Sequence, residues 1–122
     1  MLYSTSGDID KFEHDKIVDI ERITFRDKSK KTENYIELPR SLATLENKKK
    51  ITVEVHEMDY DYLKDKPIIV FNSTLYMIRE SKDLKDKVIV QFSAGGLIFR
   101  VITGKENPFR LRGNRKFKVV VK

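Results

Sequence analysis

The sequence predicts an all-β protein, either a single antiparallel barrel or a sandwich, built from about eight short strands. Apolar and polar residues alternate through much of the chain, and this period of two is typical of strands with one buried face. The alternating runs are short and are separated by polar or glycine-containing segments, as in antiparallel sheets. With 122 residues the chain has the length of one domain, so we expect residues 1–122 to share one core.

The first part of the chain predicts two strands. Alternating apolar residues indicate a strand over Lys16–Phe25, in which a switch of the buried face suggests a bulge near Arg22. We expect residues 1–10, which precede this strand, to be loosely ordered. A second strand covers Tyr35–Leu38 and ends at Pro39, which lacks the N–H that a central strand needs.

The middle of the chain predicts a strand and a hairpin. Ile51–Val55 alternates without interruption and indicates a third strand. Met58–Lys66 follows, and we expect it to form a loop or a short helical turn. The runs Ile68–Phe71 and Thr74–Arg79 are separated by Asn72–Ser73, so the sequence predicts a hairpin with a two-residue turn.

The last third of the chain gives the clearest pattern. Val88–Phe92 and Leu97–Val101 alternate on either side of Gly95–Gly96, and a double glycine between such runs marks a tight turn or a bulge. Phe117–Val121 alternates with lysines and predicts the last strand. The residues that we expect to be buried in a common core are Val53, Val55, Val90, Phe92, Phe99, Val119 and Val121.

The composition excludes several kinds of site. The chain has no cysteine, which excludes disulfides, thiolate metal sites and thiol nucleophiles, and fits a reducing compartment. No apolar run approaches the roughly 20 residues that a membrane span needs, and the first residues do not resemble a signal peptide. We therefore expect a cytoplasmic protein without a membrane partner.

Charge is divided unevenly along the chain. Residues 1–65 contain 12 Lys and Arg against 15 Asp and Glu, whereas residues 66–122 contain 13 against 4. The second part therefore has a net charge of +9. A basic surface of this kind attracts nucleic acid or an acidic protein partner.

The titratable residues do not form the motif of a known active site. His14 and His56 are the only histidines, and neither has a partner at the spacing of a metal site. No glycine-rich loop leads from a strand into a helix, so neither nucleotide-binding fingerprint is present. A small enzyme with a dispersed active site would need Asp59 or Asp61 to lie beside a histidine in a cleft. We expect no catalytic residue, no cofactor and no metal ion.

The irregular segment Lys105–Arg115 contains a candidate binding residue. Phe109 stands between Pro108 and Arg110, and we expect its ring to be exposed near Arg110 and Arg112. Aromatic and arginine side chains dominate protein interfaces, and they also stack bases and hold phosphates in small barrels that bind single strands. The segment is therefore compatible with a protein-docking surface and with a nucleic-acid surface.

The stretch Val88–Val101 resembles the most recognisable part of the eighth-subunit family of multisubunit DNA-directed RNA polymerases, which has archaeal and eukaryotic members. That family typically has a strand, Ser, an aromatic residue, Gly-Gly-Leu, two apolar residues, Arg and another apolar residue. Here Ala94 takes the place of the aromatic residue. The matching positions are Gly95, Gly96, Leu97 and Arg100.

Weaker similarity covers most of the chain. Thr74 and Tyr76, with the later Ser81–Leu84, fall at nearly the expected distance before the glycines, and Phe117–Lys122 resembles the family's closing strand. The long acidic insertion of eukaryotic members is reduced here to Glu57–Lys66. A short version rich in Lys and Ile suits an archaeal member.

The resemblance implies an eight-stranded antiparallel barrel similar to an oligonucleotide-binding (OB) fold, in a subunit without catalytic residues. Such a subunit docks on the largest polymerase subunit and on the subunit-D-type assembly platform, as a monomer within a hetero-oligomer, and helps the enzyme to assemble. Its compartment would be the archaeal cytoplasm, or the nucleus in a eukaryote. The residues expected at the subunit interface are Gly95, Gly96, Leu97, Arg100, Phe109, Arg110 and Arg112.

The alternative function is a stand-alone OB-type module that binds single-stranded RNA or DNA. This function would explain the basic C-terminal third of the chain. It predicts an affinity that falls steeply as the salt concentration rises, because bound phosphates release their counterions.

Overall fold

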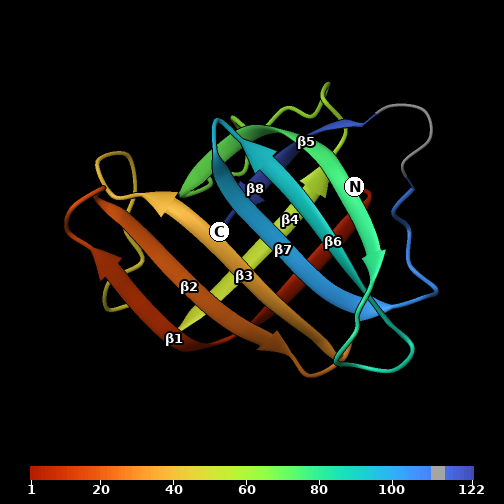
Figure 1. The fold of residues 1–122 in the computed structure, drawn as a ribbon. Helices are drawn as coiled ribbons and strands as arrows, with labels where there is room; N and C mark the ends of the chain where they lie inside the picture. The colour runs from red at the N-terminus through yellow and green to blue at the C-terminus, as the bar shows by residue number, and fades with distance from the viewer. Residues whose placement is uncertain (111–114) are drawn as a thin grey trace.

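The computed structural model describes residues 1–110 and 115–122, and within them the chain forms strands and no helix (Figure 1). No helix in this part of the chain is long and apolar enough to cross a membrane. The strands are β1 (Tyr3–Asp15), β2 (Ile20–Asp27), β3 (Thr32–Pro39), β4 (Lys50–His56), β5 (Ile69–Glu80), β6 (Lys87–Ala94), β7 (Leu97–Gly104) and β8 (Lys116–Val121).

The strands close into one ring in the order β1-β2-β3-β7-β6-β5-β8-β4, and each neighbouring pair is antiparallel. The ring is complete because β1 pairs with β4 as well as with β2. This arrangement confirms the predicted antiparallel barrel and is consistent with an OB-like fold. A closed sheet leaves no long edge strand to pair with other chains.

Alternation along the strands fills the barrel with apolar side chains. In β7, for example, Phe99 and Val101 face the core, while Ile98, Arg100 and Ile102 lie on the outside. The seven residues that the sequence predicted to be buried are all in the core: Val53, Val55, Val90, Phe92, Phe99, Val119 and Val121.

β1 is the element that the sequence pattern missed. The structure differs from the loose order expected for residues 1–10, because Tyr3–Asp8 pairs with β4 and the strand then continues along β2 as far as Asp15. β1 reads YSTSGDIDKFEHD, in which polar residues predominate. Its apolar alternation is therefore too weak to be recognised without knowledge of the strands that flank it.

The strand predicted over Lys16–Phe25 is wrong in its first residues, because residues 16–19 form a turn in which Ile17 is 95 % exposed. With the exposed apolar residues Ile17 and Val18 of this turn included in the strand, the sequence pattern gives a switch of the buried face that the structure does not have. The bulge predicted near Arg22 is also wrong. The shift of register between β1 and β2 lies at Asp10, where the paired residues pass from Ile9 to Lys11.

The predicted hairpin over residues 68–79 is wrong as well, because β5 is one strand that continues through Asn72 and Ser73. Ser73 is buried, and its hydroxyl donates a hydrogen bond to the carbonyl of Phe117 over 3.2 Å. The strand pairs with β8 up to Thr74 and with β6 from Thr74 onward. A polar dipeptide in a strand that changes partners thus resembles a turn in the sequence.

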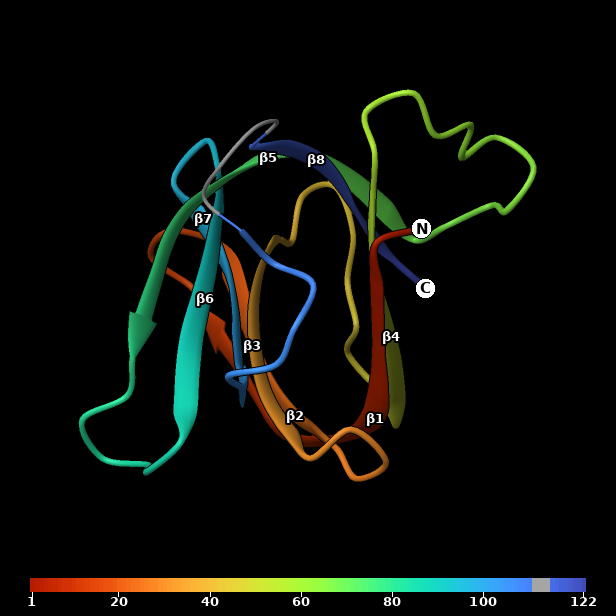
Figure 2. The same ribbon diagram turned by 90° about the vertical axis from the view of Figure 1, so that its right-hand side faces the viewer.

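Both openings of the barrel are covered by connecting segments, 40–49 and 105–110, which cross the ring of strands in Figure 2. Leu45 lies in the core and fixes the first segment together with Glu21. The buried Glu21 carboxylate accepts hydrogen bonds from the backbone N–H of Leu45 over 2.8 Å and from Thr44 Oγ1, and it forms an ion pair with Arg40. A buried carboxylate is stable when its oxygens are satisfied in this way.

Gly7 lies where β1 passes close to β2. A Cβ atom on this residue would lie only 1.9 Å from the carbonyl oxygen of Arg26. Because that oxygen belongs to the backbone of a paired strand, it cannot move aside as the end of a side chain could. The sharp approach of the two strands therefore requires glycine.

We expect Gly7→Ala to lower the free energy of unfolding by about 2 kcal/mol or more, since overpacking against backbone forces the strands apart. Urea unfolding followed by circular dichroism measures this change. Gly104→Ala is the matched control, because nothing lies within 4 Å of a Cβ at Gly104. Equal stability of the two variants would contradict a close approach at Gly7.

Asp27 fixes the start of the β2–β3 turn. Burial raises the pKa of this carboxyl, but hydrogen bonds from the backbone N–H groups of Ser6 and Lys30 and from the hydroxyls of Ser29 and Thr5 outweigh it. The pKa therefore lies below the ordinary value for aspartate. A lowered pKa in the folded state means that the unfolded chain binds the proton more tightly, so this carboxylate stabilises the fold at neutral pH.

The Asp27 contribution should be complete well above the ordinary Asp pKa of about 4 and should disappear as the pH falls through and below that value. In Asp27→Asn, we expect the stability deficit relative to the wild type to shrink between about pH 6 and pH 3. Urea midpoints across this range test the prediction, with the exposed Asp83→Asn as control. A deficit that is constant with pH would contradict it.

Candidate docking surface

The outside of the β6–β7 hairpin is more apolar than the outside of β2 and β3. Ile89 in β6 and Ile98 and Ile102 in β7 alternate with buried residues, so they face outward, where they are half-buried. On β2 and β3 the corresponding outward positions include Arg26 and Glu33. Antiparallel strands with one face in water normally carry polar residues there, and apolar side chains on both faces are typical of strands covered on both sides.

We call this area the β6–β7 outer face and define it by Ile89, Gln91, Ile98, Arg100 and Ile102. Arg100 lies at its centre and is held in place by its neighbours. The Arg100 Nε atom donates a hydrogen bond to Gln91 Oε1 over 2.7 Å, and its guanidinium carbon lies 5.3 Å from the centre of the Tyr35 ring. The Gln91 amide in turn donates to the hydroxyl of Tyr76. The row thus crosses β3, β7, β6 and β5.

The terminal nitrogens of Arg100 remain available. Within residues 1–110 and 115–122, no group accepts a hydrogen bond from either Nη atom. An arginine that is fixed at Nε and free at its Nη atoms presents a preorganised fork, the geometry that a carboxylate or a phosphate accepts in a bidentate pair.

Tyr35 also links β3 to the start of β7 through Glu37. Its hydroxyl donates to Glu37 Oε2 over 2.7 Å, and Glu37 Oε1 accepts the backbone N–H of Ile98 over 2.9 Å. Burial raises the pKa of Tyr35 to about 12, with a further contribution from the hydrogen bond to Glu37. The hydrogen bond to Glu37 thus holds the Tyr35 hydroxyl while its ring lies beside Arg100.

The glycine pair forms the turn that joins β6 to β7. Gly95 and Gly96 have φ angles of 58° and 92°, which match a type I′ turn, and Ala94 pairs with Leu97 across it. A Cβ at either glycine would meet nothing within 4 Å. The glycines are thus required by their positive φ angles, and their exposed surface is open to a partner.

Phe109 is not the exposed aromatic residue that the sequence predicted. Its side chain is 2 % exposed, and its ring lies 4.9 Å from that of Tyr3 and 5.5 Å from that of Phe92, measured between ring centres. The Asn107 side chain accepts the backbone N–H of Phe109 over 2.9 Å, and this local turn directs the ring into the barrel. The placement at the interface is therefore wrong for this residue.

The seven predicted interface residues do not form one surface. Arg110 is exposed, but its Nη1 atom donates to the carbonyls of Asn107 and Phe109, each over 2.6 Å. The Gly95–Gly96 turn precedes β7 and Arg110 belongs to the segment that follows it, so the two lie in connections at opposite ends of this strand (Figure 1). Arg112 lies outside the described residues.

The structure brings Arg100 together with Gln91 and Tyr35, which the sequence analysis did not assign to a site. Leu97 lies on the same face of β7 as the buried Phe99 and Val101, so it is not part of the β6–β7 outer face. Gln91, a polar residue inside the otherwise apolar run of β6, was the sequence feature that could have indicated the cluster around Arg100. The partnership of Arg100 with Tyr35 could not be recognised, because the two residues pair only through the register of β3 and β7.

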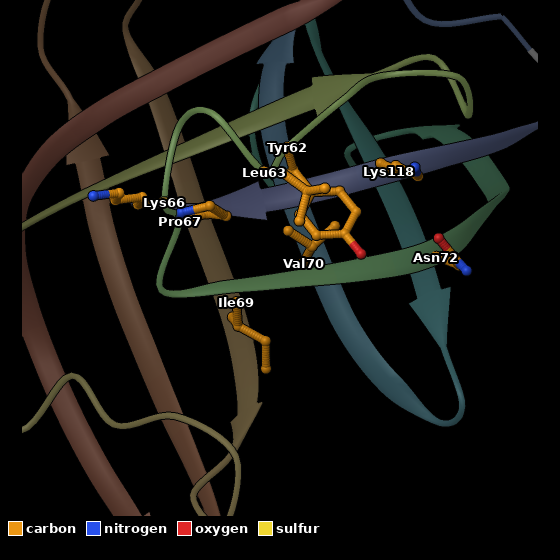
Figure 3. Close-up of a pocket in the computed structure, with 8 residues that line it drawn as sticks. All are labelled: Tyr62, Leu63, Lys66, Pro67, Ile69, Val70, Asn72 and Lys118. Carbon is orange, nitrogen blue, oxygen red and sulfur yellow. The ribbon is translucent and has the colours of Figure 1, made fainter.

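A second candidate is a groove of about 510 Å³ on the outside of the barrel (Figure 3). It lies at the first residues of β5, away from the part of this strand that pairs with β6. We call it the Tyr62 groove. Segment 57–68, which connects β4 to β5, forms one wall, and the outer face of β5 and β8 forms the floor and the other wall. Its lining residues are Tyr62, Leu63, Lys66, Pro67, Ile69, Val70, Asn72 and Lys118.

Within the described residues, neither Asp59 nor Asp61 forms an ion pair with a histidine. In the described part of the chain, the ring of His56 bonds with Glu54 over 2.8 Å and that of His14 with Asp19 over 2.8 Å. Asp61 accepts the backbone N–H of Leu63 in its own loop. Nor do three or more His, Asp or Glu side chains among these residues gather in a group that could hold a metal ion.

The chain matches no protein-family model and no curated protein sequence.

We expect Phe109→Ala to destabilise the isolated protein by about 3–5 kcal/mol, because it empties a space between Tyr3 and Phe92 in the core. Glu106→Ala, an exposed position of the same segment, should change the free energy of unfolding by less than about 0.5 kcal/mol. Thermal and urea unfolding measure both. If Phe109→Ala and Glu106→Ala had equal melting curves, the Phe109 ring would not lie in the core in solution.

Proposed function

We propose that this chain is a non-catalytic small subunit of a DNA-directed RNA polymerase, which helps to assemble and stabilise the enzyme by docking on larger subunits. The observation that carries the proposal is the β6–β7 outer face, which is apolar and has a fixed arginine at its centre. The stretch on which the sequence resemblance rests, Val88–Val101, forms the same two strands.

The composition of the β6–β7 outer face supports docking on a protein. Isoleucine and arginine side chains lie side by side there, next to the ring of Tyr35 on β3, and aromatic and arginine residues are enriched at the centres of protein interfaces. The side chain of Arg100 is already held by Gln91 and Tyr35, so a partner would lose little conformational entropy in binding it. A carboxylate of the partner is the group that the two Nη atoms fit best.

The proposed partners are the largest polymerase subunit and the subunit-D-type assembly platform, with this chain present as one copy in the hetero-oligomer. The proposed compartment is the cytoplasm of an archaeal cell. The β6–β7 outer face would meet one of these partners, and the exposed Gly95–Gly96 turn lies at its edge, where a neighbouring subunit could approach the backbone closely.

The direct experiment is to isolate the tagged chain from its own cells and to identify the bound proteins by mass spectrometry. The proposal requires the two large polymerase subunits in amounts comparable to the tagged chain, after washing at high salt. Their absence from a preparation in which the tagged chain is folded would overturn the proposal.

We expect Arg100→Ala to weaken incorporation into the enzyme by about 1–3 kcal/mol, which is roughly 5- to 150-fold, because it removes charge-assisted hydrogen bonds to the partner. Competition between tagged variant and untagged wild type for the polymerase measures the loss. The isolated variant should melt near the wild-type temperature.

Arg26→Ala is the matched control for this measurement. Arg26 also points outward from a strand, but it lies on β2 and its nearest carboxylates are 3.8 Å away at Asp10 and 3.9 Å away at Glu33. This variant should compete as well as the wild type. If Arg100→Ala competes equally well, the β6–β7 outer face is not the docking surface.

A further inference from the structure

The Tyr62 groove is a built feature of the barrel surface, since segment 57–68 is fixed firmly to the strands beneath it. Val119 and Val121 face the core, so Val120 faces outward on β8, yet it is fully buried. The ammonium group of Lys118 donates to the carbonyl of Tyr60 over 3.1 Å. The Tyr60 ring stacks on that of His56, with ring centres 3.5 Å apart.

The lining of the groove combines an apolar floor with cationic ends. Pro67 and Val70 give the floor its apolar surface, while Lys66 and Lys118 stand at the rim (Figure 3). None of the eight described residues that line the groove carries a carboxylate. The groove thus fits a ligand that has flat or apolar parts and negative charge.

Tyr62 is the central group of the groove. Its side chain is 37 % exposed, and the Lys118 ammonium lies 5.0 Å from the centre of its ring. Within the described residues, no group forms a hydrogen bond with its hydroxyl. An exposed aromatic ring next to lysines is the arrangement with which proteins bind single strands, because every base can stack on the ring while the lysines attract phosphates.

The order of the side chains along the groove matches a linear ligand. Figure 3 shows Lys66 at one end, Tyr62 in the middle, and Lys118 followed by Asn72 at the other end. The exposed Asn72 side chain offers one donor group and one acceptor group, which can bond with the edge of a base. From this geometry we propose that the Tyr62 groove binds single-stranded nucleic acid, with a base stacked on Tyr62 and backbone phosphates at Lys66 and Lys118.

Charge favours nucleic acid over a protein segment as the occupant. Two of the eight lining residues are lysines and none is acidic, so the lining itself is cationic. A groove with cations on both sides of an aromatic ring fits a ligand that repeats phosphate and base, whereas a peptide needs acidic residues placed at matching distances. The proposal does not rest on the polymerase assignment, since it concerns a different face and a different ligand.

The experiment uses a fluorescein-labelled oligouridylate and an oligothymidylate of about twelve nucleotides, with binding followed by fluorescence anisotropy. The affinity should fall steeply between about 50 and 200 mM salt. Tyr62→Ala should weaken binding roughly 5- to 100-fold, whereas Tyr62→Phe should bind like the wild type, because stacking requires the ring and not the hydroxyl. Lys66→Gln should weaken binding and reduce the slope against salt by about 1.

Two controls on other surfaces separate the groove from general basicity. Tyr76→Ala removes a similarly exposed tyrosine beside the β6–β7 outer face, and Lys85→Gln removes an exposed lysine of the β5–β6 connection. Neither variant should change the affinity. In the wild type, the Asn72 side-chain amide signals in a ¹⁵N spectrum should shift on titration, and melting curves should report that each variant is folded.

Several results would overturn the proposal. One is an oligonucleotide that does not bind the folded wild type at the lowest salt concentration. Another is an equal loss of affinity in Tyr62→Ala and in the two controls. A third is displacement of the oligonucleotide by polyglutamate at similar charge concentration, which would assign the groove to acidic protein segments. Failure of the chain to enter a polymerase would leave these measurements unaffected.

Discussion

Closure of the barrel depends on two strands that change partners along their length. β1 pairs with β4 up to Asp8 and with β2 from Asp8 onward, and β5 pairs with β8 up to Thr74 and with β6 from Thr74 onward. Each strand bends where it changes, and Gly7 is the residue that lets β1 approach β2 at one of these bends. Without these changes of partner the sheet would remain open and expose two edges.

Closure also decides where the protein can act. The interior is filled by side chains, and its two openings are covered by segments that insert Leu45 and Phe109 into the core. Binding must therefore use the outside of the barrel. There the β6–β7 outer face has aliphatic residues around a fixed arginine, whereas the Tyr62 groove has an aromatic ring between two lysines. The first chemistry fits a protein partner and the second fits a polyanion.

The two surfaces are supported by different physical means. Arg100 is positioned by side chains on neighbouring strands, so its geometry depends on the register of the sheet. Tyr62 belongs to a connecting segment, and its position depends on contacts that Tyr60 makes with His56 and Lys118. The first position is thus set by strand pairing, and the second by contacts of a connecting segment with the strands beneath it.

The sequence by itself determined the all-β class, the antiparallel arrangement and the buried core of β4, β6, β7 and β8, because a period of two is a local property that each strand displays alone. Only the tertiary structure decided that the polar β1 is a strand, that Asn72 and Ser73 continue β5, and that Phe109 enters the core. Likewise, Arg100 was recognisable as a candidate, but its contact with Tyr35 was not. The reason is physical: which strands pair, and in which register, is set by contacts between residues far apart in the chain, and no local pattern encodes them.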